Sequence, residues 1–145
     1  MVVSALPAIS LDDHAAQLPE AIDFLGIDVE GAEMSILSGG RQTISRDVLG
    51  VLTEVMFYKL LEGQKTFGEL SAFLESSGYR FVWIKPHPDQ YAFSRRPIGL
   101  RGRGGVTDTG DALFLRDPEH VRENHPEPDL GLAKLAFMAL NFALL

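Results

Sequence analysis

The sequence contains no cysteine among its 145 residues. This absence excludes a disulfide framework, a thiolate zinc site and a cysteine nucleophile. Positive charge is also scarce, because 13 lysine and arginine residues stand against 20 acidic residues and leave a formal net charge of −7. A general nucleic-acid-binding role is therefore disfavoured, since phosphate binding requires local positive charge. The remaining composition, 46% hydrophobic and 23% charged, is that of an ordinary globular domain.

Long hydrophobic runs are absent as well. The longest apolar stretch covers residues 132–145, where Lys134 and Asn141 interrupt it. A bilayer-spanning helix needs about 20 apolar residues, so we predict no transmembrane segment. The first ten residues include no basic residue, so we do not expect a signal peptide there. The absence of cysteine leaves the compartment open, and we expect a cytoplasmic location. We expect the terminal stretch to form a helix that packs on protein; a dimer contact and a membrane-surface helix are the alternatives.

Short apolar segments predict strands that alternate with helices. The predicted strands cover residues 24–29, 48–57, 79–84 and 112–115. Helical spacing of apolar residues at 67–74 and an acidic first turn after residue 29 predict the helices between them. We also expect a short helix capped by Asp12 or Asp13. The order predicts an α/β fold, in which helices cover a mostly parallel sheet and the last strand returns antiparallel beside the third.

Acidic residues follow the first predicted strand. Asp28 and Glu30 lie at a strand-to-helix turn, the place where open α/β sheets bind ligands, and Gly31 permits close backbone approach. Such an acid could act as a general base towards a hydroxyl, hold a cation or hydrogen-bond a ligand. Alternatively, Glu30 and Glu33 only serve the helix N-terminus. Glu54, near the end of the second predicted strand, either faces the same crevice or satisfies local backbone groups.

The stretch 85–109 predicts a long loop with prolines, glycines and clustered positive charge. The stretch contains four arginines: Arg95, Arg96, Arg101 and Arg103. Their guanidinium groups could bind a phosphate, a sugar nucleotide or a carboxylate. The alternative is a solvated loop without a ligand. His14 could act near neutral pH, although an isolated histidine is more often a surface residue. The other histidines lie in proline-rich loops without ligand spacing, so we predict no metal site. Residues 117–129 are expected to be a polar linker.

Several segments resemble the signature of FkbM-type methyltransferases. Residues 11–13 (LDD) match a tLD segment, and residues 22–33 (IDFLGIDVEGAE) match the pattern D-x-(I/L)-K-(I/L)-D-V-E-G-x-E. Agreement continues in order at residues 36–40, 53–55, 67–70, 78–79 and 110–115. The resemblance thus covers roughly residues 9–118. Gly26 stands where relatives usually carry lysine.

The resemblance implies a Rossmann-like class I methyltransferase fold with S-adenosylmethionine as cofactor. Relatives bind the cofactor at a Gly-rich turn after their first strand, and no such turn follows a strand before residue 24. We therefore expect residues 1–118 to be the C-terminal half of an FkbM-like domain, a truncated domain with strands in the order fourth, fifth, seventh, sixth. Residues 119–145 would be a linker and an apolar C-terminal helix. Because segment 24–29 would be an unpaired edge strand, we expect a homodimer, through this edge or through the helix, or a separate N-terminal half to cover it.

The function implied by the resemblance is methylation of a hydroxyl oxygen on a small molecule or a glycan. We assign catalytic roles to Asp28, Glu30 and Glu54, and cofactor binding to Asp28 and Gly31. Acceptor binding is assigned to the four loop arginines and His14. The alternative is a non-catalytic remnant or protein-interaction module that retains the half-sheet.

Overall fold

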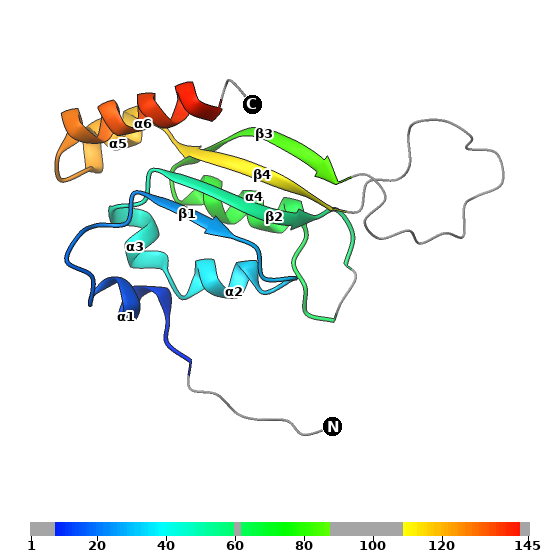
Figure 1. The fold of residues 1–145 in the computed structure, drawn as a ribbon. Coiled ribbons are helices and arrows are strands. Elements are labelled where there is room, and N and C mark those ends of the chain that lie inside the picture. Colours follow the sequence, from blue (N-terminus) through cyan, green and yellow to red (C-terminus); the bar gives the residue numbers. More distant parts are fainter. Residues whose placement is uncertain (1–7, 60–61, 88–108, 143–145) are drawn as a thin grey trace.

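The fold is a four-stranded mixed sheet with helices on both faces. The computed structural model describes residues 8–59, 62–87 and 109–142. The strands are β1 (Phe24–Ile27), β2 (Gly50–Met56), β3 (Tyr79–His87) and β4 (Thr109–Arg116), in the order β1-β2-β4-β3 (Figure 1). β1 and β2 are parallel, whereas β4 is antiparallel to both β2 and β3. This confirms the predicted α/β class, strand order and antiparallel last strand, and it is consistent with a partial Rossmann-like fold.

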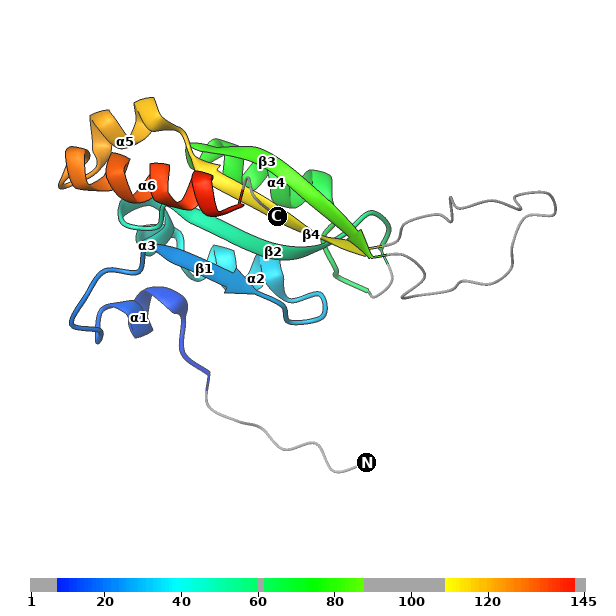
Figure 2. The ribbon, with the colours of Figure 1, turned by 45° about the horizontal axis from the view of Figure 1, so that its top comes forward.

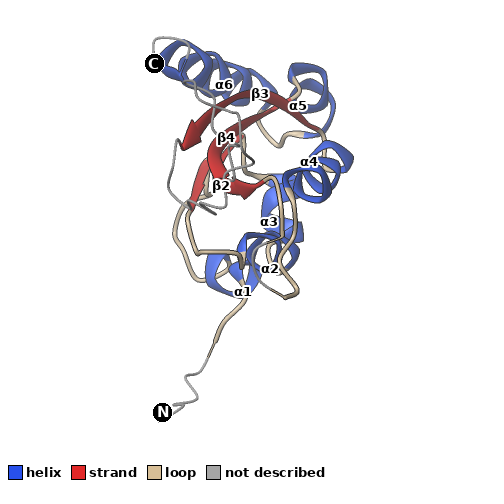
Figure 3. Ribbon diagram, turned by 90° about the vertical axis from the view of Figure 1, so that its right-hand side faces the viewer, coloured by secondary structure: helices blue, strands red, loops and turns tan. Residues whose placement is uncertain are grey.

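Helices from the two halves of the chain cover opposite faces of the sheet. One face carries α2 (Glu33–Ser38), α3 (Arg41–Arg46) and α4 (Phe67–Ser76), and the short α1 (Leu11–Ala15) packs against α3. The other face carries α5 (Pro118–Asn124) and α6 (Pro128–Phe142), as Figures 2 and 3 show. Because successive strand residues point to opposite faces, β4 contributes Ala112 and Phe114 to one core cluster and Leu113 and Leu115 to the other.

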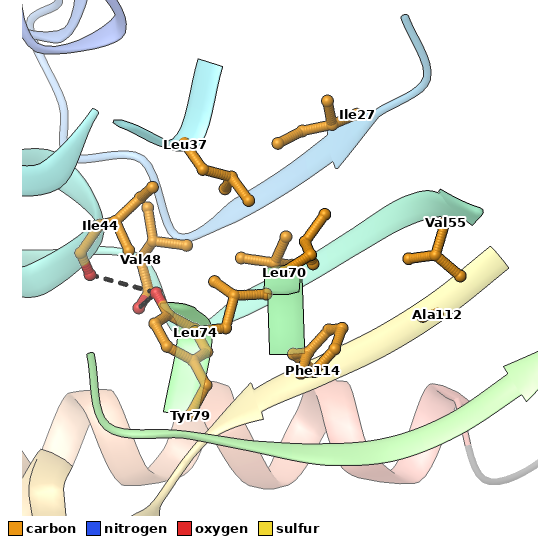
Figure 4. Packing of buried hydrophobic residues seen from close by; sticks show 11 residues of the cluster. Ile27, Leu37, Ile44, Val48, Val55, Leu70, Leu74, Tyr79, Ala112 and Phe114 are labelled. Carbon is orange, nitrogen blue, oxygen red and sulfur yellow. Dashed lines mark hydrogen bonds between the residues drawn. The ribbon is translucent and has the colours of Figure 1, made fainter. Parts of the chain in front are cut away.

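The larger cluster lies between the sheet and helices α2 to α4 (Figure 4). Tyr79 closes one end of this cluster, and its hydroxyl donates hydrogen bonds to the carbonyls of Ile44 and Val48 at 3.1 and 2.7 Å. Arg116, which is only 3% exposed, donates to the same two carbonyls and to the Tyr79 hydroxyl. Buried polar groups must find such partners, so this network fixes where α3 ends against the sheet.

Two predictions about helices are wrong. Ser10, not Asp12 or Asp13, caps α1, and the Asp12 carboxylate instead accepts hydrogen bonds from the backbone N–H groups of Gln42 and Thr43 at the start of α3. The expected linker 117–129 contains the helix α5. Asp117 caps this helix and Pro118 occupies its first turn, a combination that favours helix initiation despite the polar sequence.

The apolar C-terminal helix packs on the sheet, as predicted. Leu135 of α6 is buried in the smaller cluster, Phe142 stacks on Phe24 at a centroid distance of 5.3 Å, and Lys134 pairs with Asp23 at 2.7 Å. α6 also leaves Phe137 69% exposed. Among the described residues, no helix has both the length and the apolar character that crossing a membrane requires.

Candidate functional site

The candidate site lies where three strands end at the same edge of the sheet. β1 and β2 are parallel, and β3 runs in the same direction because both β2 and β3 are antiparallel to β4. Their carboxyl ends therefore meet at one side of the molecule (Figure 1). Asp28 directly follows β1, Glu54 lies near the end of β2, and His87 is the last residue of β3. Open α/β sheets bind ligands beyond such strand ends.

The three acids predicted to be catalytic come together here. Asp28, Glu30 and Glu54 each offer one carboxylate oxygen, and these three oxygens lie within 4.8 Å of one another. Asp28 and Glu30 are exposed, whereas Glu54 is only 5% exposed. The cluster thus has a buried floor on β2 and an accessible rim on the loop that follows β1.

Backbone conformation determines where that loop places Glu30. Glu30 and Gly31 have consecutive positive φ angles, 52° and 107°. The Glu33 carboxylate holds the turn, because its Oε1 accepts hydrogen bonds from the N–H groups of Val29 at 3.3 Å and Gly31 at 3.0 Å. A Cβ at residue 31 would lie 2.9 Å from Nε2 of Gln64, a side chain that is itself buried. Glu33 therefore has the structural role that the sequence left open, and glycine is required at 31.

Electrostatics set Glu54 apart from its neighbours. Burial raises the pKa of the Glu54 carboxyl, and the negative charges of Asp28, Glu30 and Glu33 raise this pKa further, against a lowering effect of His87. Within the described part of the chain, Oε2 of Glu54 has no hydrogen-bond partner. A carboxylate with a raised pKa is a stronger base than an ordinary one, so Glu54 could take a proton from a hydroxyl group. The same crowding of negative charge favours a bound positive group.

His87 and Asp111 belong to this site, although no sequence pattern predicts either of them there. Nε2 of His87 lies 2.8 Å from Oδ2 of Asp111, and Nδ1 lies 3.7 Å from Oε1 of Glu54. The strand register explains this proximity, because Asp111 is the cross-strand partner of Glu54 and His87 the partner of Thr109. β3 continues through Pro86 to reach His87; an edge strand tolerates proline, which cannot donate a ladder hydrogen bond. No local sequence signal indicates this pairing.

Among the remaining predicted site residues that the structure describes, His14 does not join the cluster. His14 is exposed on α1, which packs against α3. Arg95, Arg96, Arg101 and Arg103 lie outside the described residues. Gly26, where relatives usually carry lysine, is exposed, and a Cβ there would meet no atom within 4 Å. Packing therefore does not require glycine at this position.

Comparison with known proteins identifies the family. The family model for the methyltransferase FkbM domain matches residues 3–81, more than half of the chain. The chain therefore belongs to the FkbM methyltransferase domain family, and the matched segment includes Asp28, Glu30 and Glu54. Searches of curated proteins and of solved structures gave no match.

Proposed function

We propose that this protein is an S-adenosylmethionine-dependent methyltransferase that methylates a hydroxyl oxygen of a small molecule or a glycan. The observation that carries the proposal is the carboxylate cluster at the carboxyl ends of β1 and β2, in a chain of a methyltransferase family. In this proposal the strands of residues 1–118 correspond to the fourth, fifth, sixth and seventh strands of the class I fold, with β4 as the seventh. The cytoplasmic location stays a prediction.

The acids have separate roles in this proposal. The cofactor supplies an electrophilic methyl group next to a positive sulfur, and the negative field of the cluster suits that charge. Asp28 and the Gly31 backbone would contact the cofactor. The Glu54 carboxylate would accept the proton of the acceptor hydroxyl as that oxygen takes the methyl group that the bound cofactor would supply. Glu30 would orient the hydroxyl, and this positioning supplies much of the rate.

Binding of S-adenosylhomocysteine, measured by isothermal titration calorimetry, tests the proposal. We expect saturable heat with the full chain and weaker binding for Asp28→Asn. Glu20→Gln, which removes an exposed carboxylate from the segment before β1, serves as the matched control and should bind like the parent protein. Absence of heat and of a thermal shift at millimolar ligand would favour the second candidate, a non-catalytic interaction module.

The acceptor site stays a set of predictions. The four loop arginines are proposed to bind a phosphate, sugar or carboxylate group of the acceptor. His14 was assigned the same role, but its position on α1 next to α3 does not bring it into the carboxylate cluster. Replacing Arg95 and Arg96 together with glutamine should raise KM for an acceptor once one is known, with little effect on cofactor binding.

We also propose that the protein forms a homodimer through β1 or α6. In the described sheet, β1 pairs only with β2, so its other edge has unpaired backbone groups. Beside this edge, a mainly apolar groove of about 560 Å³ is lined by Phe24 and residues of α6, including Phe137. Multi-angle light scattering over a dilution series should report a dimer, and Phe137→Ser should weaken it if α6 forms the contact. A monomer at every concentration would refute the proposal.

A further inference from the structure

We propose that Asp28, Glu30 and Glu54 bind a divalent metal cation at the carboxyl ends of β1 and β2. The histidine spacing predicted no metal site, but these three ligands are carboxylates that come from two separate segments of the chain. The inference goes beyond methyl transfer, because cation binding can be measured without cofactor or acceptor.

Two independent observations support the site. First, one oxygen from each of the three carboxylates lies within 4.8 Å of the others, so a single ion can contact all three. Second, only 5% of Glu54 is exposed to solvent, yet its Oε2 has no hydrogen-bond partner among the described residues. A buried carboxylate oxygen normally has a donor or a cation beside it, and a cation at the cluster would supply the missing partner.

The charged groups around Asp28 and Glu54 bear on the charge balance of the site. Within the described residues, no lysine or arginine forms an ion pair with Asp28 or Glu54. His87 lies 3.7 Å from Glu54, but its Nε2 faces the Asp111 carboxylate at 2.8 Å. Glu33, which adds a further negative charge, is held by two backbone N–H groups of the loop. Within the described residues, Asp28 and Glu54 therefore keep negative charge that a divalent ion would balance.

The ligand chemistry selects the kind of ion. Carboxylate oxygens suit hard cations such as Ca²⁺, Mn²⁺ and Mg²⁺. Ca²⁺ holds oxygens at about 2.3–2.6 Å, so ligands on opposite sides of the ion lie about 5 Å apart, whereas Mg²⁺ requires about 4 Å. The three oxygens lie within 4.8 Å of one another, which is inside the span of a Ca²⁺ coordination shell. Asp28 and Glu30 are exposed and leave room for water molecules to complete the coordination shell.

Manganese titration followed by electron paramagnetic resonance tests the site directly. The signal of free Mn²⁺ falls as the ion binds, so the measurement counts bound ions directly. After EDTA treatment and dialysis, the full chain should bind one Mn²⁺ with a Kd of about 10⁻⁵ to 10⁻³ M in moderate salt. Ca²⁺ should displace the Mn²⁺ at lower concentration than Mg²⁺, and the reverse order would overturn the size argument.

Variants separate this site from diffuse attraction to an acidic protein. Glu54→Gln and Asp28→Asn should each weaken Mn²⁺ binding by roughly tenfold or more, since each removes a charged ligand. Glu20→Gln removes one negative charge outside the cluster and should leave the Kd unchanged. Asp28 is exposed, so Asp28→Asn tests the site even if Glu54→Gln, a substitution at a buried residue, disturbs folding. Equal affinity of all three variants and the parent, or no saturable binding, would overturn the proposal.

Discussion

Replacing Gly31 with alanine should destabilise the protein through two separable effects. Gly31 has a φ angle of 107°, which residues with a Cβ rarely adopt. In addition, the new methyl group would lie 2.9 Å from Nε2 of Gln64, closer than such atoms can remain. Gln64 is only 3% exposed, so its side chain cannot move freely into solvent. Both effects act on the turn that places Glu30 in the carboxylate cluster.

The size of the loss follows from adding the two contributions. A positive φ angle costs a non-glycine residue roughly 1–2 kcal/mol. Displacing the buried Gln64 amide costs a further ~1 kcal/mol, the typical net contribution of a hydrogen bond. Gly31→Ala should therefore lower the free energy of unfolding by about 2–3 kcal/mol. Urea denaturation followed by circular dichroism at neutral pH measures this difference.

Two other glycines provide matched controls. Gly63 has a φ angle of 81°, but a Cβ there would meet no atom within 4 Å, so Gly63→Ala should cost only the backbone contribution of roughly 1–2 kcal/mol. Gly68 lies inside α4 in open space, so Gly68→Ala should stabilise the protein by about 0.5 kcal/mol. In a Gln64→Ala background, the loss from Gly31→Ala should fall to the Gly63→Ala value. Equal losses at positions 31 and 63, or no coupling to Gln64, would refute the reasoning.

Three further substitutions test the packing and the charges. Leu135→Ala should lower the free energy of unfolding, measured by urea denaturation, by about 3 kcal/mol because it leaves a cavity under α6. A loss below about 1 kcal/mol would mean that α6 is not packed on the sheet. Tyr79→Phe should cost about 1–2 kcal/mol by the same assay, since the carbonyls of Ile44 and Val48 lose a donor. The Lys65 ammonium and the Thr66 backbone N–H lower the pKa of Glu69 from 4.5 to about 2. The stability that this carboxylate contributes is therefore present above pH 4.5 and is lost as the pH falls towards 2. The melting temperature of Glu69→Gln should depend less on pH between about 4.5 and 2 than that of the parent protein.

Most elements of the fold could be predicted from local patterns. Continuous apolar segments predicted all four strands, and the helical spacing at residues 67–74 predicted α4. The helix α5 was missed because its polar, proline-marked sequence was interpreted as a linker, although the pair Asp117–Pro118 is a helix start signal. The cap of α1 was misassigned for a different reason. Asp12 serves α3, some 30 residues further along the chain, and no local pattern indicates such a partner.

The site was predicted in part. The acids at the ends of β1 and β2 were identified because ligands bind at the carboxyl ends of parallel strands, and the structure brings Asp28, Glu30 and Glu54 together. The proline- and glycine-rich composition of residues 85–109 predicts a loop that includes His87. The position of His87 beside Glu54 and Asp111 depends on β3 continuing past Pro86 and on the register between β3 and β4. Register depends on which side chains can be buried on each face, a property of the assembled sheet.

The sequence by itself determined the α/β class, the strand order through family resemblance, and two of the four segments that form the site. Strand periodicity and strand-end motifs are local properties of the chain. Only the tertiary structure decided that Glu54 is buried beneath Asp28 and Glu30 and that His87 and Asp111 lie beside it. The physical reason is that burial and charge crowding depend on groups brought together by strand pairing. The basicity of Glu54 and the proposed affinity for a cation arise from that assembly, not from any single motif.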